Sequence, residues 1–468
     1  MKSITSKTSS VAKSLNIYES FNLMDIMQKC PYAKEILTED KINEAINDLK
    51  KVLCYCQSVP PVYMIKSYDA LDEIPKVSYT NEKVAHPMLN KIIIGQIFRD
   101  NKMKKYTLWD LFIEHQLQFT VKAVKFYSQD PQVFSYFRGY DFKQLDQVNN
   151  ELIQPFLNHI HDVIANNNDE ISNYIINWIA SILQKPSFKT ETALVILGNQ
   201  GTGKNVFTNV ICKLMARYAN ENVTNIESIV GRFNAALENK KLLVLNELQS
   251  IDVNKYLNSD ALKSVITDKK TNINQKNEPE RLCENVCNFI MVSNNNVPIK
   301  IESTDRRYMV TKTSDSKRGD FEYFDNLCDS FTPEFYENLF TFFMKHDISK
   351  VNLRKIPNSE AKELIKEASM SSYELFVREY YDQINNITGP SLFKLYCEFV
   401  DKNKFNTCSS RTFITNIKPF TGDAVSKWID GKAQKVYSLT KEYVTKFKKY
   451  HDDLESHIVD DEIPDDAL

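Results

Sequence analysis

The stretch that decides the fold of this chain runs Leu194-Val195-Ile196-Leu197-Gly198-Asn199-Gln200-Gly201-Thr202-Gly203-Lys204-Asn205. It joins a short apolar run to the Gly-x-x-x-x-Gly-Lys spacing of a phosphate-binding P-loop. Glycines let backbone N–H groups converge on phosphate oxygens, which a Cβ would obstruct. Apolar residues then recur at helical spacing, namely Phe207, Val210, Ile211, Leu214 and Met215. We therefore expect a strand, a turn and a helix in which residues 198–205 hold the phosphates of a nucleotide and Lys204 reaches the β- and γ-phosphates.

Position 205 departs from the usual pattern. It carries Asn where Ser or Thr normally gives a hydroxyl to Mg²⁺. The Asn205 amide oxygen could bind the metal directly or through water, so the sequence supports a nucleotide more strongly than a metal. The alternative is a glycine-rich turn in an unrelated fold.

Length and composition describe an ordinary globular chain of about two to four domains. It has 468 residues, 42% of them hydrophobic and 26% charged, and a net charge of −2. Any nucleic-acid surface must therefore be a local basic patch. No apolar run of roughly eighteen residues predicts a membrane span. The nine cysteines are scattered without zinc-site spacing, so we expect reduced thiols in a soluble, intracellular protein.

Three segments precede the nucleotide domain. Residues 1–95 are expected to be mainly helical, with one helix over 39–54, and residues 96–150 to form a small β-containing module. Residues 151–189 carry one apolar stripe at helical spacing, formed by Ile171, Tyr174, Ile175, Trp178, Ile179 and Ile182. This stripe predicts either a plain core helix or a collar that packs subunits side by side.

Four segments complete the chain. The nucleotide domain is expected over 190–312 and a helical extension over 313–370. Residues 371–450 read as helix, helix and hairpin, which is a winged-helix outline. This domain either contacts DNA or is a small protein-contact domain with a solvated basic face. The acidic residues 451–468 are expected to be disordered. In the DNA reading the facing cations are Arg411, Lys418, Lys427, Lys432 and Lys435.

Hydrolysis of a nucleotide needs more than a P-loop, and two later apolar strands end in suitable polar residues. The first ends in Asn246-Glu247, where Glu247 would orient the attacking water and Asn246 would face the Mg²⁺ shell, although Asp would bind the metal more strongly. The second ends in Asn294, which would contact the γ-phosphate or the water. Ligands collect at the carboxyl ends of parallel strands, so these side chains should meet the P-loop.

A pair of arginines precedes a third apolar segment. Arg306 or Arg307 could act as an arginine finger, stabilising transition-state charge on the ATP of a neighbouring subunit. Each of these elements alone usually has a structural explanation. Their order within residues 198–307 is far more specific.

With these elements in place, the sequence resembles the superfamily 3 helicases, which are compact AAA+ ATPases of DNA viruses and related elements. It is most similar to the helicase half of poxvirus-type primase–helicases, found also in phages, plasmids and giant viruses. Residues 198–205 look like Walker A, 242–247 like Walker B, 292–294 like motif C and 305–307 like the finger segment. Residues 271–281 are similar to a hairpin that contacts DNA in the pore. The likeness extends over about 130–440, with strong motifs only in 194–310.

The resemblance implies an α/β fold with an AAA+ P-loop core and a parallel sheet, a helical collar before it and a winged-helix-like C-terminal domain. It further implies an ATP-dependent replicative DNA helicase that binds ATP and Mg²⁺ between the subunits of a ring, usually a hexamer, and threads single-stranded DNA at a fork. Lys276 in the hairpin turn would contact DNA, with Arg281, Lys269 and Lys270 as further candidates. About six copies of one lysine around a pore create a strong local field; the alternative for Lys276 is a solvated loop lysine.

Two departures keep other functions open. Asn205 and Asn246 replace the residues usually expected on Mg²⁺, which points to slow turnover, whereas Lys204 and Glu247 argue against an inactive enzyme. The N-terminal part carries no carboxylate pattern of a fused primase, so either this protein has no primase or its primase is another polypeptide. The alternatives are a P-loop ATPase used for initiator loading, packaging or RNA unwinding, and a DNA-binding module that keeps nucleotide as structural glue. A viral protein of this kind would act in the host cytoplasm or nucleus.

Overall fold

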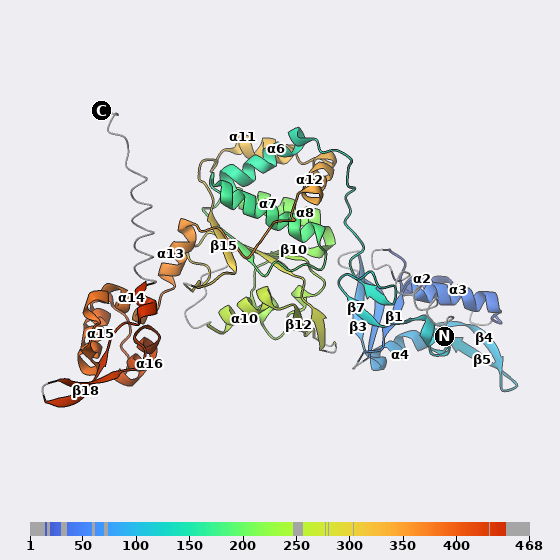
Figure 1. The fold of residues 1–468 in the computed structure, drawn as a ribbon. Coiled ribbons are helices and arrows are strands. Elements are labelled where there is room, and N and C mark those ends of the chain that lie inside the picture. Colours follow the sequence, from blue (N-terminus) through green and yellow to red (C-terminus); the bar gives the residue numbers. More distant parts are fainter. Residues whose placement is uncertain are drawn as a thin grey trace. The chain divides into compact units, whose positions relative to one another are not determined.

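The chain forms two compact units, Met1–Ile365 and Lys366–Leu468 (Figure 1). The computed structural model describes residues 15, 19–29, 35–58, 61–69, 74–246, 256–276, 278, 280–302, 304–429 and 431–445. Among these residues, no helix is both long enough and apolar enough to cross a membrane.

A five-stranded parallel sheet forms the centre of the first unit. Its inner strands are continuous apolar runs with polar residues only at their ends, as expected for strands that are covered on both faces. The predicted α/β class with a parallel sheet is confirmed. In spatial order the strands are β10 (Ala219–Val223), β11 (Leu242–Asn246), β14 (Asn288–Ser293), β9 (Ala193–Leu197) and β15 (Tyr308–Lys312).

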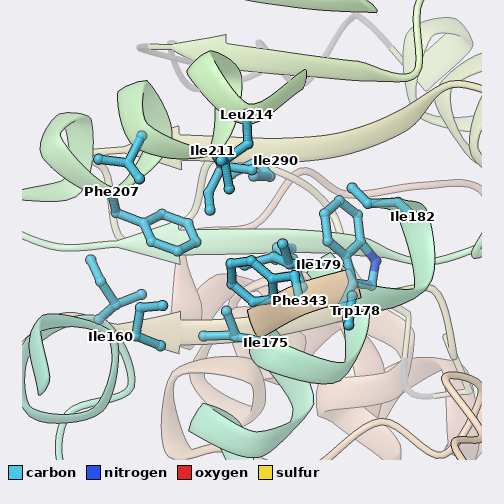
Figure 2. Packing of buried hydrophobic residues seen from close by; sticks show 14 of the residues in the cluster. Ile160, Ile175, Trp178, Ile179, Ile182, Phe207, Ile211, Leu214, Ile290 and Phe343 are labelled. Carbon is cyan, nitrogen blue, oxygen red and sulfur yellow. The ribbon is translucent and has the colours of Figure 1, made fainter. Parts of the chain in front are cut away.

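Helices on one face of this sheet enclose the largest apolar cluster (Figures 1 and 2). Alternate strand residues such as Leu194 and Ile290 point to this face, because successive side chains of a strand alternate. Trp178, Phe207 and Phe343 close over them from the helices. The helices are α6 (Asn150–Asn158), α7 (Asp169–Gln184), α8 (Lys204–Met215) and α12 (Pro333–Lys345), with a π-helical turn at His159–Ile164.

Helix α7 is a core helix. Asn168 caps its N-terminus by accepting a hydrogen bond from the Ile171 N–H at 2.9 Å, and Asp169 and Glu170 in the first turn favour the positive end of the helix dipole. Its apolar stripe is buried against the sheet and α12 of the same chain. Residues 151–189 are therefore a layer of the α/β core of the first unit, and the reading of α7 as a separate collar between subunits does not fit this burial.

The opposite face of the sheet is covered by a second set of elements (Figure 1). Val195, Leu243 and Met291, which are neighbours in sequence of the residues on the first face, pack here against Leu262 and Ile365. The helices are α9 (Glu227–Val230), α10 (Tyr256–Thr267) and α13 (Glu360–Ala368). The result is a three-layer α/β/α arrangement. Helix α11 (Phe321–Asp329) follows β15.

The hairpin expected between the second and third motifs is present. Strands β12 (Lys270–Ile273) and β13 (Arg281–Glu284) pair antiparallel, with Lys270 opposite Glu284 and Ile273 opposite Arg281. Lys276 is exposed in the connecting turn.

In the described part of residues 1–95, strands are mixed with the helices, so this part is not mainly helical. It does contain helices, but the helix expected over 39–54 ends at Lys50 because Leu53–Cys56 form β1, which pairs with β2 and with the distant β6. The expected boundary at 95/96 also falls inside β4, which forms a hairpin with β5. The pairing of β1 with β6 joins segments far apart in sequence, so local periodicity does not reveal it. The elements are α2 (Leu23–Lys29), α3 (Glu39–Lys50), β1 (Leu53–Cys56), β2 (Val62–Asp69), β3 (Ile74–Thr80), α4 (Glu82–Asn90), β4 (Ile93–Arg99), β5 (Lys102–Thr107), α5 (Leu108–Glu114), β6 (Thr120–Val121), β7 (Ala123–Lys125) and β8 (Val133–Ser135).

The second unit has the predicted order of helix, helix and hairpin, preceded by one more helix and a short strand. Phe376, Tyr396 and Phe413 form the centre of its core. Strand β16, only two residues long, was not predicted; it joins the hairpin in a sheet of order β16-β18-β17. The acidic segment 451–468 lies outside the described residues. The elements are α14 (Ser372–Glu379), β16 (Ile387–Thr388), α15 (Gly389–Asn403), α16 (Ser410–Thr421), β17 (Val425–Ile429) and β18 (Lys432–Tyr437).

Candidate nucleotide-binding site

The loop between β9 and α8 requires its glycines for two physical reasons. Gly198, Gly201 and Gly203 have φ angles of 150°, 82° and 83°, which side-chain-bearing residues rarely adopt. A Cβ on Gly198 would also lie 1.9 Å from Thr313 Oγ1, and one on Gly203 would lie 2.5 Å from His159 Cε1. The loop is therefore held in a shape that only glycine permits, with the N-terminus of α8 directly behind it. Such a helix terminus favours an anion.

Lys204 is folded back over this loop. Its Nζ donates hydrogen bonds to the carbonyl oxygens of Gly198 at 2.7 Å and Asn199 at 2.6 Å, and the residue is 6% exposed. Burial lowers the pKa of the ammonium, while Asp315 acts in the opposite direction. The charge is thus poised above the loop, where a phosphate would offer it better partners than neutral carbonyls.

Residues after β15 brace the loop from outside. Thr313 donates to Thr202 Oγ1 at 2.9 Å, and Thr202 donates to the Asn199 carbonyl at 3.0 Å. The Asn199 side chain donates to the Asp315 carboxylate at 2.9 Å. Sequence reasoning did not find Thr313 and Asp315; their only signal is that they directly follow a strand that ends beside the loop.

His159 braces the loop from the π-helical turn. Its Nε2 lies 3.2 Å from the Gly203 carbonyl and its Nδ1 3.1 Å from the Tyr323 hydroxyl. Since a carbonyl only accepts, Nε2 carries a proton, and in the neutral ring Nδ1 accepts from the Tyr323 hydroxyl. Burial lowers the pKa of His159 to about 4, with the Gly203 carbonyl acting in the opposite direction. Nothing in the sequence around His159 signalled this position.

A cavity of about 850 Å³ opens beside the loop at the carboxyl edge of the sheet. The structure brings residues 200–205 of the loop together there with Asn246 and Asn294, as expected for side chains at the ends of β11 and β14. Glu247 lies outside the described residues. Asn209, Glu221, Thr224 and Phe324 also line the cavity and were not predicted. Glu221 belongs to β10. This strand has only five residues, so its alternation of apolar and polar residues is too short to predict a strand that ends at a functional site.

The cavity walls suit a polyphosphate and a hard cation. Loop backbone, the Lys204 ammonium and a helix terminus suit phosphates, and the side-chain oxygens of Asn205, Asn246 and Glu221 are of the kind that Mg²⁺ binds. Glu221 is the only carboxylate among the described residues that line the cavity. Asn246 donates to the Glu221 carbonyl oxygen at 3.2 Å, which ties the ends of the two neighbouring strands. In the described part of the chain, no cluster of three His, Cys, Asp or Glu side chains could hold a metal ion.

The two arginines lie at the other edge of the sheet. They directly precede Tyr308, which pairs with Ala193 at the start of β9, whereas the P-loop follows the end of β9. At about 3.3 Å per residue the strand separates them from the loop by roughly 15 Å. Arg306 is exposed, and Arg307 pairs with Asp305 at 3.2 Å. The structure therefore does not bring either arginine to the cavity of its own chain.

The proposed DNA-contacting cations of the hairpin have different environments. Lys276 is exposed at the turn, and Lys269 and Lys270 are exposed at the base, with Lys269 3.9 Å from Glu191. Arg281 is instead buried, with a side chain only 10% exposed. The expectation that Arg281 faces DNA does not fit this position.

Arg281 holds the hairpin to the rest of the first unit. Its guanidinium pairs with Glu238 and with Glu278 at 3.0 Å, and it lies 4.2 Å from the ring centroid of Tyr79. The Asn239 amide donates to the Tyr79 hydroxyl at 3.0 Å. These contacts give Arg281 a structural role that its position beside a loop lysine did not suggest.

Comparison with known proteins adds relatives from phage. Residues 196–307 match the family model described as Family of unknown function (DUF5906). The chain is 30% identical over 218 residues to the DNA primase-polymerase of Nitratiruptor phage NrS-1, which is 44% of this chain and 29% of that protein. The chain thus matches less than a third of the length of this relative.

Solved structures of the same phage protein share the fold. The apo structure of the NrS-1 C-terminal region (305–718) is similar with a TM-score of 0.59 and 18% identity, over 86% of this chain and 100% of that one. An A-form apo structure of the same region is similar with a TM-score of 0.56 and 19% identity, over 84% and 98%. At this identity the likeness concerns the fold.

Proposed function

We propose that this chain is a viral replication protein of the primase–helicase type, and that it works as an ATP-dependent DNA helicase of superfamily 3. The observation that carries the proposal is the cavity at the carboxyl edge of the parallel sheet, where the P-loop, Asn246 and Asn294 meet. The relative named a DNA primase-polymerase supports a role in DNA replication.

The order of the strands supports an AAA+ core. Strand β14, which ends at Ser293 and is followed by Asn294, lies between the P-loop strand β9 and the strand β11 that ends in Asn246. A polar amide thus stands between the phosphate loop and the strand end assigned to metal and water. That is the place from which a side chain can sense a γ-phosphate.

Each residue has a defined task in this proposal. The loop N–H groups and Lys204 bind and orient the phosphates, and Asn294 positions the γ-phosphate or the attacking water. Asn205, Asn246 and Glu221 offer oxygens to Mg²⁺, and Glu247 orients the water. Bound Mg²⁺–ATP supplies the phosphoryl group and partial neutralisation of its charge. Since Arg306 and Arg307 lie at the opposite sheet edge, either would act on the ATP of a neighbouring subunit, which requires a ring, with a hexamer as the expected form.

Single-stranded DNA would pass through that ring at a replication fork in the host cell. The exposed Lys276, with Lys269 and Lys270 at the hairpin base, would supply the contacts with phosphates. A primase or polymerase would act as a separate partner.

The test is ATP hydrolysis with and without single-stranded DNA, together with particle mass and strand displacement on a forked duplex. The proposal expects a particle of about six chains, hydrolysis stimulated by single strands, and ATP-dependent displacement. Stimulated hydrolysis without displacement would replace the helicase with another P-loop ATPase. A monomer without turnover would contradict the proposal.

One observation favours a second candidate function. Asn205 and Asn246 stand where a hydroxyl and a carboxylate bind Mg²⁺ more strongly, and both line the cavity. A nucleotide-stabilised DNA-binding or initiator module would bind ATP through the loop and hydrolyse it very slowly. Tight ATP binding without multiple turnover, in the presence of single-stranded DNA, would favour this function.

A further inference from the structure

The hairpin of the second unit presents an exposed tryptophan. Trp428 on β17 is 79% exposed, whereas Trp178 is fully buried and Trp109 is half-buried. The hairpin, β17 and β18, is called the wing below. A large flat indole is held in water on a rigid strand pair, which is the form of a stacking platform.

The register of the wing places a lysine beside this indole. Trp428 pairs with Ala433 and Ser426 pairs with Lys435, so these four side chains share one face of the ladder, called the outer face. Lys427 pairs with Gln434 on the opposite face, where its Nζ donates to the Asn386 side-chain oxygen at 2.6 Å. Of the three lysines of the wing, Lys435 therefore shares the outer face with Trp428, whereas Lys427 and Lys432 lie on the opposite face.

The two strands of the wing carry only positive charge. They contain Lys427, Lys432 and Lys435 and no acidic residue, in a chain whose net charge is −2. On the neighbouring helix α16 the charge is weaker, because Lys418 pairs with Asp423 at 2.7 Å. The strands of the wing thus offer a local attraction for a polyanion.

We propose that the outer face of the wing binds single-stranded DNA, with one unpaired base stacked on Trp428 and the phosphate beside it contacted by Lys435. An indole needs an accessible base face, and in a duplex these faces are already stacked on each other. The lysines need phosphates, which an apolar protein surface does not offer. The choice of DNA over RNA rests on the proposed function, but the contact itself needs no nucleotide.

The test uses the full chain without ATP. Oligo-dT quenches the emission of the exposed tryptophan, and Trp428→Ala removes this quenching and weakens binding about fivefold to a hundredfold. Lys435→Ala weakens binding more than the matched control Lys427→Ala, whose ammonium lies on the other face. Far-ultraviolet circular dichroism confirms that the variants are folded, since all three side chains are exposed.

Four results would overturn the inference. They are unchanged oligo-dT affinity of Trp428→Ala, equal losses in Lys435→Ala and Lys427→Ala, equal quenching by a duplex of the same length, and tighter binding of oligo-U than of oligo-dT. If the protein shows no ATP turnover but oligo-dT still quenches its tryptophan emission, the DNA site on the wing is supported and the proposed helicase function is contradicted. Lys204 lies in the other unit, so oligo-dT should quench the tryptophan emission of Lys204→Ala as strongly as that of the wild type.

Discussion

The P-loop and the β12–β13 hairpin each carry a lysine with a predicted function, but the two lysines have opposite environments in the structure. Lys204 is 6% exposed and is held by two carbonyls of a loop that His159, Thr202 and its own glycines fix in shape. Lys276 is exposed in a turn. The proposed phosphate site is thus organised within one chain, whereas the hairpin lysine offers only a charge, whose proposed effect depends on neighbouring copies and on DNA.

The largest effect is expected at the organised site. Lys204→Ala removes the ammonium that lies over the loop, so the binding free energy of ATP should weaken by about 5 kcal/mol. The remaining binding would be too weak to detect in most assays. Titration with a fluorescent ATP analogue measures this. Lys213→Ala is the matched control, because Lys213 is exposed in the last turn of the same helix. If the two variants bind alike, the loop is not the nucleotide site.

A smaller effect is expected where the hairpin is itself organised. Arg281→Ala leaves Glu238 and Glu278 without their buried cation, so the free energy of unfolding of the first unit should fall by about 3–4 kcal/mol. Urea denaturation followed by the emission of the buried Trp178 reports it. Arg281→Lys should recover only part, because an ammonium cannot reproduce the guanidinium fork. Unchanged stability of Arg281→Ala would return Arg281 to the list of DNA contacts.

The buried His159, which contacts the Gly203 carbonyl, should make the free energy of unfolding sensitive to acid. The pKa of His159 is about 4 when folded, below its ordinary value near 6.5, so between these pH values only the unfolded chain takes up the proton. The free energy of unfolding should therefore fall by up to about 3 kcal/mol as the pH drops from 6.5 to 4. His159→Gln, which can still donate to Gly203, should lose less over this range in denaturation curves measured at each pH.

His161→Gln is the control for that measurement. His161 is only partly covered, and its pairing with Asp162 and Asp169 raises its pKa, so removing it should not reduce the acid sensitivity. Equal acid sensitivity of His159→Gln and the wild type would mean that the buried ring is not the titrating group.

The smallest effect on a single chain is expected at Lys276. Lys276→Ala should leave basal hydrolysis and stability within about 0.5 kcal/mol of the wild type, since the side chain is exposed. Stimulation by single-stranded DNA and strand displacement should be lost, because the loss of charge is repeated around the ring. Lys350→Ala, another exposed lysine outside the hairpin, should keep both activities. Undiminished displacement by Lys276→Ala would contradict the pore assignment.

Much of the core could be read from the sequence because its signals are local. Apolar runs that end in Asn246 and Asn294, the glycine spacing of 198–203, the hairpin around Lys276 and the helix-helix-hairpin order of the second unit all depend on residues near each other in the chain. The same holds for the expectation that the strand ends meet the P-loop, since parallel strands share one carboxyl edge. None of these signals says how a residue is surrounded in space.

The sequence by itself therefore determined the parallel α/β core, the loop and the residue types at its edge. Only the tertiary structure decided that α7 is a core layer, that β1 pairs with β6, that His159 braces Gly203, that Glu221 enters the cavity and that Arg281 is buried. The physical reason is that turn chemistry and periodicity act over a few residues, whereas burial and charge pairing join segments such as 238 and 281 that meet only when the chain has folded.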